Sequence, residues 1–289
     1  MEETDFLRDQ NIAIVGLGLM GASIAMGLRG RCKMILGSDT DSLVCQLATA
    51  KGIVDSASTD LREILPLADV LILATPVSAA LKIISTLPTL VSVHNGSKLI
   101  VTDVTSTKVQ IMRALASLPS NFDIIGGHPI CGKEKLGICH AEKEMLYDCT
   151  YTLTPAERTS ARTKSLLTQL VEAIGGNPLW IGPEKHDRML AKTSHAPHLL
   201  AVALMHATEL NLSKLKAGGF SSATRLSATP TSMMLSMVMT NAENTVAALE
   251  AVKTEIDEIV KLMKAGDEEN LAILLDSSKA KREEMMRRA

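Results

Sequence analysis

The chain has 289 residues, of which 21% are charged and 46% belong to the hydrophobic set, and its formal net charge is −2. This length and composition indicate a folded protein of one or two domains and exclude a wholly disordered chain. The balanced charge argues against nucleic-acid binding, and no apolar run reaches the ~20 residues that span a bilayer. The five cysteines include no Cys-x-x-Cys pair, so neither a disulfide framework nor a zinc finger is expected. The acidic N-terminus lacks the features of a secretion signal, which predicts a cytoplasmic protein.

Residues 1–182 alternate short apolar runs with segments of helical character. Several runs are unbroken Ile, Val and Leu, which is typical of parallel strands buried on both faces. Strands separated by helices predict a doubly wound α/β sheet of the Rossmann type over this first domain. Thr154-Pro155-Ala156-Glu157 predicts a helix start, with a capping residue followed by Pro at the first helical position. The expected strands are Ile12–Val15, Met34–Gly37, Val70–Ala74, Leu99–Thr102, Asp123–Ile125, Thr150–Leu153 and Leu179–Ile181.

Residues 183–289 contain no further convincing strand and are expected to form an all-helical second domain. Pro183–Leu210 predicts a long helix interrupted at Pro197, because proline cannot donate the hydrogen bond that a continuous helix requires there. Asn241–Lys264 predicts another helix, and the last helix is expected to begin at a cap on Asp267. A seam of apolar residues on the Asn241–Lys264 helix fits either an intramolecular bundle or a dimer of two copies. Its members are Leu249, Val252, Ile256, Ile259 and Met263.

A Gly-x-Gly-x-x-Gly motif follows the first predicted strand and precedes a predicted helix. Gly16 permits a tight turn, Gly18 lets the backbone approach a pyrophosphate, and Gly21 lets the helix pack on the strand. Asp39 ends the second strand 23 residues after Gly16, close to the ~20 expected for the carboxylate that binds the adenosine ribose. This carboxylate also repels a 2′-phosphate, so NAD is favoured over NADP. The residues expected to contact the dinucleotide are Gly16, Leu17, Gly18, Leu19, Met20, Gly21, Asp39, Thr75, Pro76 and Asp103.

Three further segments carry polar residues that suit chemistry. Thr102–Lys108 begins at a strand end and contains Ser106. His128 lies between Gly127 and Pro129 at another strand end, a position unsuited to a packing residue. His195 and His198 are three residues apart and share one helix face. A metal site on these two histidines is not indicated, because no third ligand lies at a diagnostic spacing.

Together these segments resemble the prephenate/arogenate dehydrogenases of tyrosine biosynthesis. The resemblance rests on the glycine motif, Thr102–Lys108, Gly127–Gly132, Ser194–His198 and Gly218–Arg225, in this order within roughly residues 10–260. It implies an NAD-dependent oxidative decarboxylation. A hydride leaves the ring carbon that bears the hydroxyl, the ring carboxylate departs as CO2, and the product is aromatic. Prephenate is the expected substrate and 4-hydroxyphenylpyruvate the product, with arogenate, which carries an ammonium in place of the keto group, as the alternative.

The resemblance also implies roles for individual residues. His128 is expected to accept the proton of the ring hydroxyl, which suits a group whose ordinary pKa is ~6.5. Ser106 is expected to orient His128 and the substrate hydroxyl, and Arg225 to bind a substrate carboxylate. His195 and His198 are assigned to the substrate site without separate roles. A homodimer through the helical domain is expected, and no metal.

Two other functions stay open at this point. A β-hydroxyacid dehydrogenase of the 3-hydroxyisobutyrate type also has a Gly-x-Gly-x-Met-Gly motif and a helical second domain, and its catalytic lysine would correspond best to Lys192. An NAD-binding regulator without catalysis is the other, although the joint presence of Ser106, His128 and Arg225 argues against it. An acidic residue near the pocket would favour arogenate, and the sequence identifies none. Cys131 is interpreted as a small residue that fits the histidine segment, since the implied chemistry needs no thiol.

Overall fold

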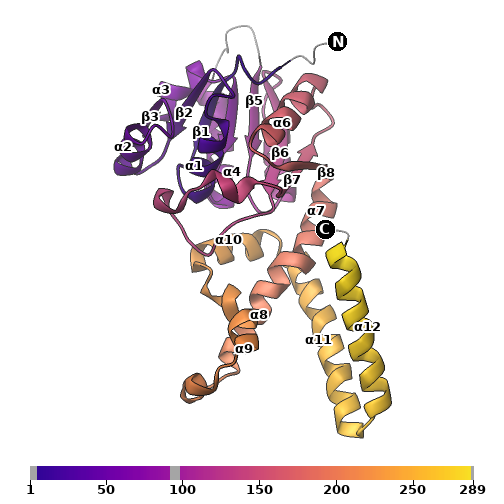
Figure 1. The fold of residues 1–289 in the computed structure, drawn as a ribbon. Coiled ribbons are helices and arrows are strands. Elements are labelled where there is room, and N and C mark those ends of the chain that lie inside the picture. The colour runs from indigo at the N-terminus through magenta and orange to yellow at the C-terminus, as the bar shows by residue number, and fades with distance from the viewer. Residues whose placement is uncertain (1–4, 92–97, 288–289) are drawn as a thin grey trace. The chain divides into compact units, whose positions relative to one another are not determined.

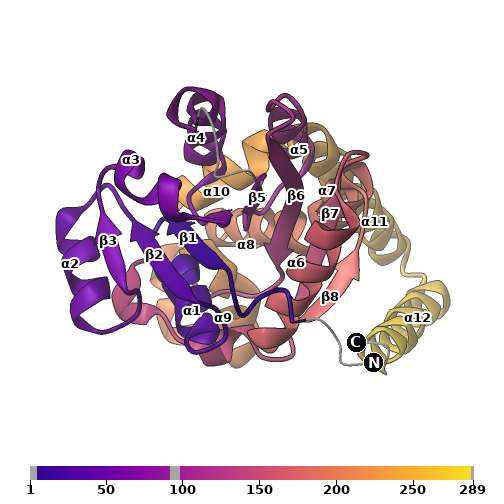
Figure 2. The same cartoon turned by 90° about the horizontal axis from the view of Figure 1, so that it is seen from above.

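The computed structural model describes residues 5–91 and 98–287, and within them one eight-stranded sheet precedes the C-terminal helices. The strand order is β3-β2-β1-β4-β5-β6-β7-β8, and neighbours are parallel except for the antiparallel pair β6–β7 (Figure 2). The predicted Rossmann-type sheet is therefore confirmed. The strands are β1 (Asn11–Val15), β2 (Met34–Ser38), β3 (Ser56–Ser58), β4 (Val70–Leu73), β5 (Leu99–Asp103), β6 (Phe122–Pro129), β7 (Thr150–Pro155) and β8 (Asn177–Trp180).

Helices cover both faces of the sheet (Figure 2). Helices α1 and α6 lie on one face, where Ile12 and Ile14 of β1 join their core, and α4 and α5 lie on the other, where Ala13 and Val15 are buried. Because alternate residues of a strand point to opposite faces, this two-sided burial explains the unbroken apolar runs. The helices of this part are α1 (Leu19–Leu28), α2 (Ser42–Ala50), α3 (Leu61–Ile64), α4 (Val77–Leu90), α5 (Val109–Ala116) and α6 (Ala161–Ala173).

After Trp180 the described residues are helices and loops, as predicted. The chain forms two compact units, Met1–Ala242 and Glu243–Ala289. The first unit ends with α7 (Pro183–Leu190), a π-helical segment (Ala191–His195), α8 (Ala196–His206), α9 (Gly218–Thr224) and α10 (Thr231–Thr240). The second consists of α11 (Ala242–Ala265) and α12 (Glu268–Arg287), which Figure 1 draws in yellow tones. The division into domains at residue 182 stays a prediction.

The interruption expected at Pro197 is a π-helical turn directly before it. The N–H of Ala196 donates to the carbonyl of Ala191, five residues back, so the backbone bulges where Pro197 could not have donated. The helix ends at His206 rather than Leu210. The predicted cap on Asp267 is confirmed, since its Oδ1 accepts the N–H of Asn270 at 3.1 Å. Among the described residues, no helix is both long and apolar enough to cross a membrane.

One local prediction is wrong, and one strand was not predicted. The helix start at Thr154 is absent, because Thr154 pairs with Gly126 in the antiparallel β6–β7 ladder, and α6 begins later behind a cap on Ser160, whose Oγ accepts the N–H of Thr163 at 3.1 Å. Strand β3 was not predicted, because its three residues, Ser-Ala-Ser, carry no apolar pattern. In both places long-range strand pairing outweighs the local signal.

Candidate functional site

The glycine motif forms the turn between β1 and α1, at the point where the strand order reverses between β1 and β4. Gly16 has φ +93°, and a Cβ there would lie 2.5 Å from the carbonyl oxygen of Ala74. A Cβ at Gly21 would overlap the carbonyl oxygen of Gly16, whereas a Cβ at Gly18 would meet nothing within 4 Å. No side chain caps the first turn of α1, so its N–H groups are available to an anion. This turn therefore fits the pyrophosphate of a dinucleotide.

Asp39 follows β2 and lies at the same turn. Its Oδ2 accepts the N–H of Leu17 at 2.8 Å, and its Oδ1 accepts the N–H of Asp41 at 3.1 Å. A carboxylate has about four acceptor positions, so this half-buried group retains positions for ribose hydroxyls. Leu17 and Leu19 bury their side chains and could meet a ligand only through their backbone. The other predicted contacts at this edge, Met20, Thr75 and Pro76, are half-buried or exposed.

A chain of three polar side chains connects β6 with α7. Nδ1 of His128 lies 3.0 Å from Nε2 of His186, and Nδ1 of His186 lies 2.8 Å from Oδ1 of Asp187. A carboxylate only accepts, so His186 donates from Nδ1, and its Nε2 then accepts a proton donated by Nδ1 of His128. Neutral His128 is thereby left with an unprotonated Nε2. This is the tautomer that a proton acceptor requires.

The Asp187 carboxylate is almost completely buried and also binds the start of α5. Oδ1 accepts the N–H of Lys108 at 2.7 Å, and Oδ2 accepts the N–H of Val109 at 2.9 Å. A helix N-terminus favours a negative charge, so this contact anchors α7 to α5. The side-chain amide of Asn241 donates to the Asp187 carbonyl at 2.7 Å and thus holds the same residue from the end of α10.

A buried ion pair lies between β5 and β6. Lys108 and Asp103 are fully buried and form the ion pair, and Nζ of Lys108 also donates to the carbonyl of Gly127 at 2.7 Å. Oδ1 of Asp103 accepts the N–H of Gly127 at 3.2 Å, and Thr105 donates its N–H to Oδ2 at 2.9 Å. Asp103 was expected to contact the dinucleotide. Its carboxylate instead has no exposed surface and binds the strand residue that precedes His128.

The electrostatic environment keeps His128 neutral. Burial lowers the pKa of His128 well below its ordinary value of 6.5, and the positive charges that His186, Lys108 and His195 can carry lower it further. Burial likewise lowers the pKa of Lys108, against the opposing effect of Asp103. At neutral pH the imidazole of His128 is therefore available as a base.

The remaining predicted residues lie on the helices that follow. His195 is fully buried, and its Nδ1 accepts from the amide of Asn241 at 3.2 Å. His198 is half-buried and donates from Nδ1 to the carbonyl of Ser194 at 2.9 Å, so its Nε2 is an acceptor. Arg225 begins a short 3-10 turn against which α8 packs, and it forms an ion pair with Glu134 of the loop after β6. Ser106 lies half-buried in the loop after β5.

The structure thus brings His128 and Asp103 together with four residues for which no role was predicted from the sequence. The missed residues of this cluster are His186, Asp187, Lys108 and Asn241. Lys108 lies within one of the polar motifs, and adjacent His186 and Asp187 precede the paired histidines. These positions were therefore visible as candidates, whereas Asn241 carries no local signal, because only the packing of α10 brings it to Asp187.

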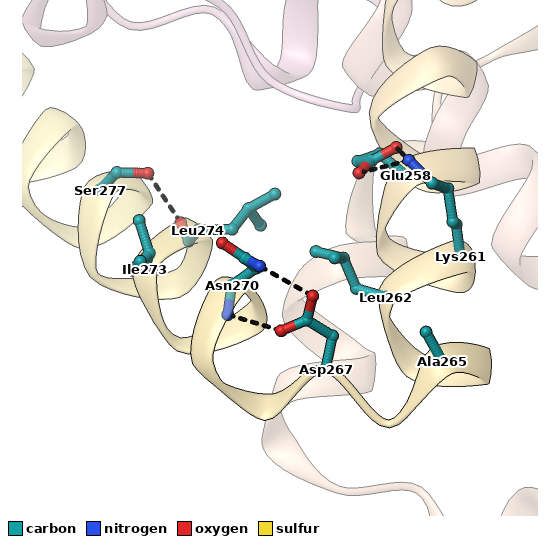
Figure 3. Close-up of a pocket in the computed structure, with 9 residues that line it drawn as sticks. All are labelled: Glu258, Lys261, Leu262, Ala265, Asp267, Asn270, Ile273, Leu274 and Ser277. Carbon is teal, nitrogen blue, oxygen red and sulfur yellow. Dashed lines mark hydrogen bonds and ion pairs between the residues drawn. The ribbon is translucent and has the colours of Figure 1, made fainter.

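A separate groove of about 450 Å³ lies in the second unit, between α11 and α12 (Figure 3). Leu262, Ile273 and Leu274 form its apolar part, and Glu258 and Lys261 pair on one side of it. Helix caps and ion pairs between neighbouring turns account for its polar side chains, including Asp267. Nothing in this groove resembles a dinucleotide or proton-transfer site.

The burial of neutral His195 predicts a pH-dependent stability. Burial lowers the pKa of His195 to about 4 on folding, so its contribution is complete above pH ~6.5 and is lost as the pH falls toward 4. The loss is about 1.4 kcal/mol per pH unit, roughly 3 kcal/mol in all. Urea unfolding at about pH 7.5 and pH 5 should show about 2 kcal/mol of this loss. His195→Gln should reduce the pH dependence, whereas substitution of exposed His206 by Gln should not. An equal pH dependence in wild type and His195→Gln would contradict this assignment.

Comparison with known proteins identifies the family. The family model for the prephenate dehydrogenase nucleotide-binding domain matches residues 24–179, and that for the prephenate dehydrogenase dimerization domain matches residues 182–277. The prephenate dehydrogenase of Lactococcus lactis is 32% identical over 286 residues, covering 96% of this chain and 77% of the relative. That of Bacillus subtilis is 30% identical over 271 residues, covering 90% and 72%.

The fold agrees with this finding. The solved structure of the Aquifex aeolicus prephenate dehydrogenase in complex with hydroxyphenyl propionate and NAD+ is similar with a TM-score of 0.88 and 30% identity. The similarity covers 96% of this chain and 99% of that one. With both family domains matched in order and the same fold along nearly the whole length, the chain belongs to the prephenate dehydrogenase family.

Proposed function

We propose that this chain catalyses the NAD-dependent oxidative decarboxylation of prephenate to 4-hydroxyphenylpyruvate, a step of tyrosine biosynthesis. The observation that carries the proposal is the His128–His186–Asp187 chain, which prepares an unprotonated imidazole nitrogen. His128 ends its strand at the carboxyl edge of the sheet, where the glycine turn also lies, and ligands of such sheets bind at this edge. A β-hydroxyacid dehydrogenase or a regulator without catalysis would have no need of this arrangement.

The dinucleotide is held by the turn after β1 and by Asp39. When bound, NAD supplies the acceptor for the hydride that leaves the substrate ring. Gly16 and Gly21 shape the turn, and the first N–H groups of α1 bind the pyrophosphate. The Asp39 carboxylate accepts the ribose hydroxyls and repels a 2′-phosphate.

His128 removes the proton of the ring hydroxyl through Nε2. The imidazolium that forms carries its charge next to His186, and the negative charge of Asp187 stabilises it through that ring. As CO2 departs, the electrons of the broken C–C bond make the ring aromatic and leave the ring oxygen as a phenolate. The phenolate takes the proton back from the His128 imidazolium, so no other base is required. Asp103 and Lys108 act through the backbone of Gly127 and position His128 rather than touching the substrate.

The substrate carboxylates bind on the side of the helices. Arg225 presents a planar guanidinium that suits bidentate binding of a carboxylate, and Nε2 of half-buried His198 offers an acceptor on α8, which packs against the turn that begins at Arg225. Ser106 contributes a hydroxyl from the loop after β5. His195, which is fully buried, supports Asn241 instead of contacting substrate. Glu134 pairs with Arg225, so a substrate carboxylate would displace Glu134 from the guanidinium. Prephenate is favoured over arogenate because the relatives at 30% and 32% identity are prephenate dehydrogenases.

The helical region forms the contact between two copies in a cytoplasmic homodimer. Apolar side chains of the predicted seam remain exposed on α11, among them Ile256 and Met263, and Ile273 and Leu275 are exposed on α12. A water-exposed apolar surface of this kind marks an interface. The description of the matched family model as a dimerization domain supports the same conclusion, with residues 1–182 as nucleotide-binding domain and residues 183–289 as substrate and dimerisation domain.

The reaction itself is tested by NADH formation from NAD in the presence of prephenate or of arogenate. We expect turnover with CO2 release and a higher kcat/KM for prephenate. A higher kcat/KM for arogenate would contradict the substrate assignment. No turnover with either compound, in protein shown to bind NAD, would contradict the proposed function.

Replacing the base tests the mechanism. His128→Asn should lower kcat by about 10²–10⁴, the usual contribution of a positioned proton acceptor, with the Kd of NAD unchanged. His140→Asn, at an exposed histidine of the following loop, serves as the matched control. Because the pKa of His128 is lowered, kcat/KM of the wild type should stay level down to pH 6.5 and fall only below it. A kcat within about tenfold of the wild type, or an acid limb centred above pH 6.5, would show that another group is the base.

Cofactor selectivity tests Asp39. Asp39→Ala should weaken NAD binding and reduce the preference for NAD over NADP roughly tenfold, which corresponds to about 1.4 kcal/mol. Asp41→Ala is the matched control, since that neighbouring carboxylate caps α2 by accepting the N–H of Leu43. Titration of both nucleotides, followed by protein fluorescence or calorimetry, gives the two Kd values. An unchanged ratio in Asp39→Ala would remove Asp39 from the ribose site.

A further inference from the structure

Two cysteines face each other just beyond the ends of the antiparallel strands. The β6–β7 register pairs Pro129 with Tyr151, and the N–H of Ile130 then donates to the carbonyl of Thr150 at 2.8 Å. The next opposite pair is Cys131 and Cys149. The two side chains are close enough for each thiol to shift the pKa of the other. Two residues distant in sequence are thus placed opposite each other by strand register.

The backbone geometry at this pair suits a disulfide. The N–H of Cys149 donates to Leu146 and its carbonyl accepts from Asn177, so neither group bonds to Cys131 across the ladder. Such non-hydrogen-bonded pairs bring opposite Cα atoms to ~4.5 Å, inside the range of ~4.4–6.8 Å found in disulfides. By contrast, the thiols of Cys32 and Cys45 donate to backbone carbonyls.

Solvent access and ionisation of the thiols also favour disulfide formation at this pair. Cys149 is buried, whereas Cys131 is half-buried and therefore accessible to solvent. The interaction between the two thiols raises the pKa of Cys131 and lowers the pKa of Cys149, so Cys149 is the member of the pair that becomes a thiolate more readily. Thiolate is the species that attacks a disulfide.

We propose that Cys131 and Cys149 form a reversible disulfide when a low-molecular-weight disulfide oxidises them, and that this bond lowers turnover. A thiolate of the pair attacks one sulfur of the small disulfide and expels a small thiolate. The second cysteine sulfur, which loses its proton to solvent, then attacks the mixed disulfide and expels the other. The protein gives up two electrons and two protons, and one small disulfide becomes two small thiols.

The effect on turnover follows from what the bond would connect, and this part rests on the proposed function. Cys131 lies three residues after His128 on the same strand end. The segment 132–148, closed by the bond, carries Glu134, which binds Arg225, and Glu142, whose N–H donates to Oγ of Ser23 on α1 at 3.0 Å. Drawing the sulfurs to bonding distance moves this strand end relative to His186. Displacements of about 1 Å at a reacting group can cost up to ~10²-fold in rate.

The test uses the full chain with exposed Cys139 replaced by Ser, so that this thiol does not react with the oxidant. Protein is incubated with oxidised glutathione, trapped with an alkylating agent and digested. We expect a peptide pair joined through Cys131 and Cys149, an intact mass lower by two hydrogen atoms, and a fall in kcat of about tenfold or more that dithiothreitol reverses. The same treatment of Cys131→Ser and Cys149→Ser should leave kcat unchanged, while Cys32→Ser should respond like the parent.

The outcomes distinguish a failure of the proposed disulfide from a failure of the proposed function. Both cysteines remaining alkylatable under oxidation, or an equal fall in kcat in Cys131→Ser, would overturn the redox site. A joined peptide with unchanged kcat would overturn its effect on turnover. If the reduced parent showed no activity with prephenate, the proposed function would fail, and the peptide and mass readouts would still decide whether the disulfide forms.

Discussion

The arrangement of the active site depends on one buried carboxylate. Asp187 accepts the first N–H groups of α5 and the Nδ1–H of His186, and Asn241 holds its backbone carbonyl. A buried charge is tolerated only when it is paired or hydrogen-bonded, and three donors bind this carboxylate. The same bonds therefore hold α7 against the sheet and fix the tautomer of His186. Through His186 they fix the orientation of the imidazole of His128. The hydrogen bonds that stabilise the fold therefore also orient the proposed base.

A second buried pair completes this environment from the side of the sheet. Lys108 and Asp103 bind the backbone of Gly127 from both its N–H and its carbonyl, which fixes the strand directly before His128. Burying two charges between β5 and β6 is costly, and the ion pair with its added hydrogen bonds offsets the cost. The same low-dielectric surroundings that strengthen these bonds lower the pKa of His128. Burial thus serves the chemistry as well as the fold.

The features that could be predicted from the sequence are those set by interactions between residues close together in the chain. The glycine turn, the apolar strands, the break before Pro197 and the histidine at a strand end all follow from steric or burial rules that act over a few residues. The helix start at Thr154 failed because Gly126 on β6, a partner far away in sequence, pairs with Thr154. The contact of Asp103 with the dinucleotide stays a prediction, and buried Lys108 already pairs with this carboxylate. Asn241 could not be found at all, since its role exists only once α10 reaches Asp187.

The antiparallel β6–β7 pair explains why the end of β6, which carries the proposed base His128, is different from its neighbours. Parallel strands of the sheet end in loops that diverge, whereas β7 runs back along β6, and Thr152 donates its hydroxyl to the carbonyl of His128 at 3.2 Å. This pairing supports the strand end on the side opposite to β5 and leaves the imidazole facing the helices. Cys131 and Cys149 lie just beyond its last pair, Pro129 and Tyr151, and the hydrogen bond from Ile130 to Thr150 continues the register toward them. The register that supports the base and the register that brings the two thiols together are therefore the same, and a change at one end of this short ladder is transmitted to the other.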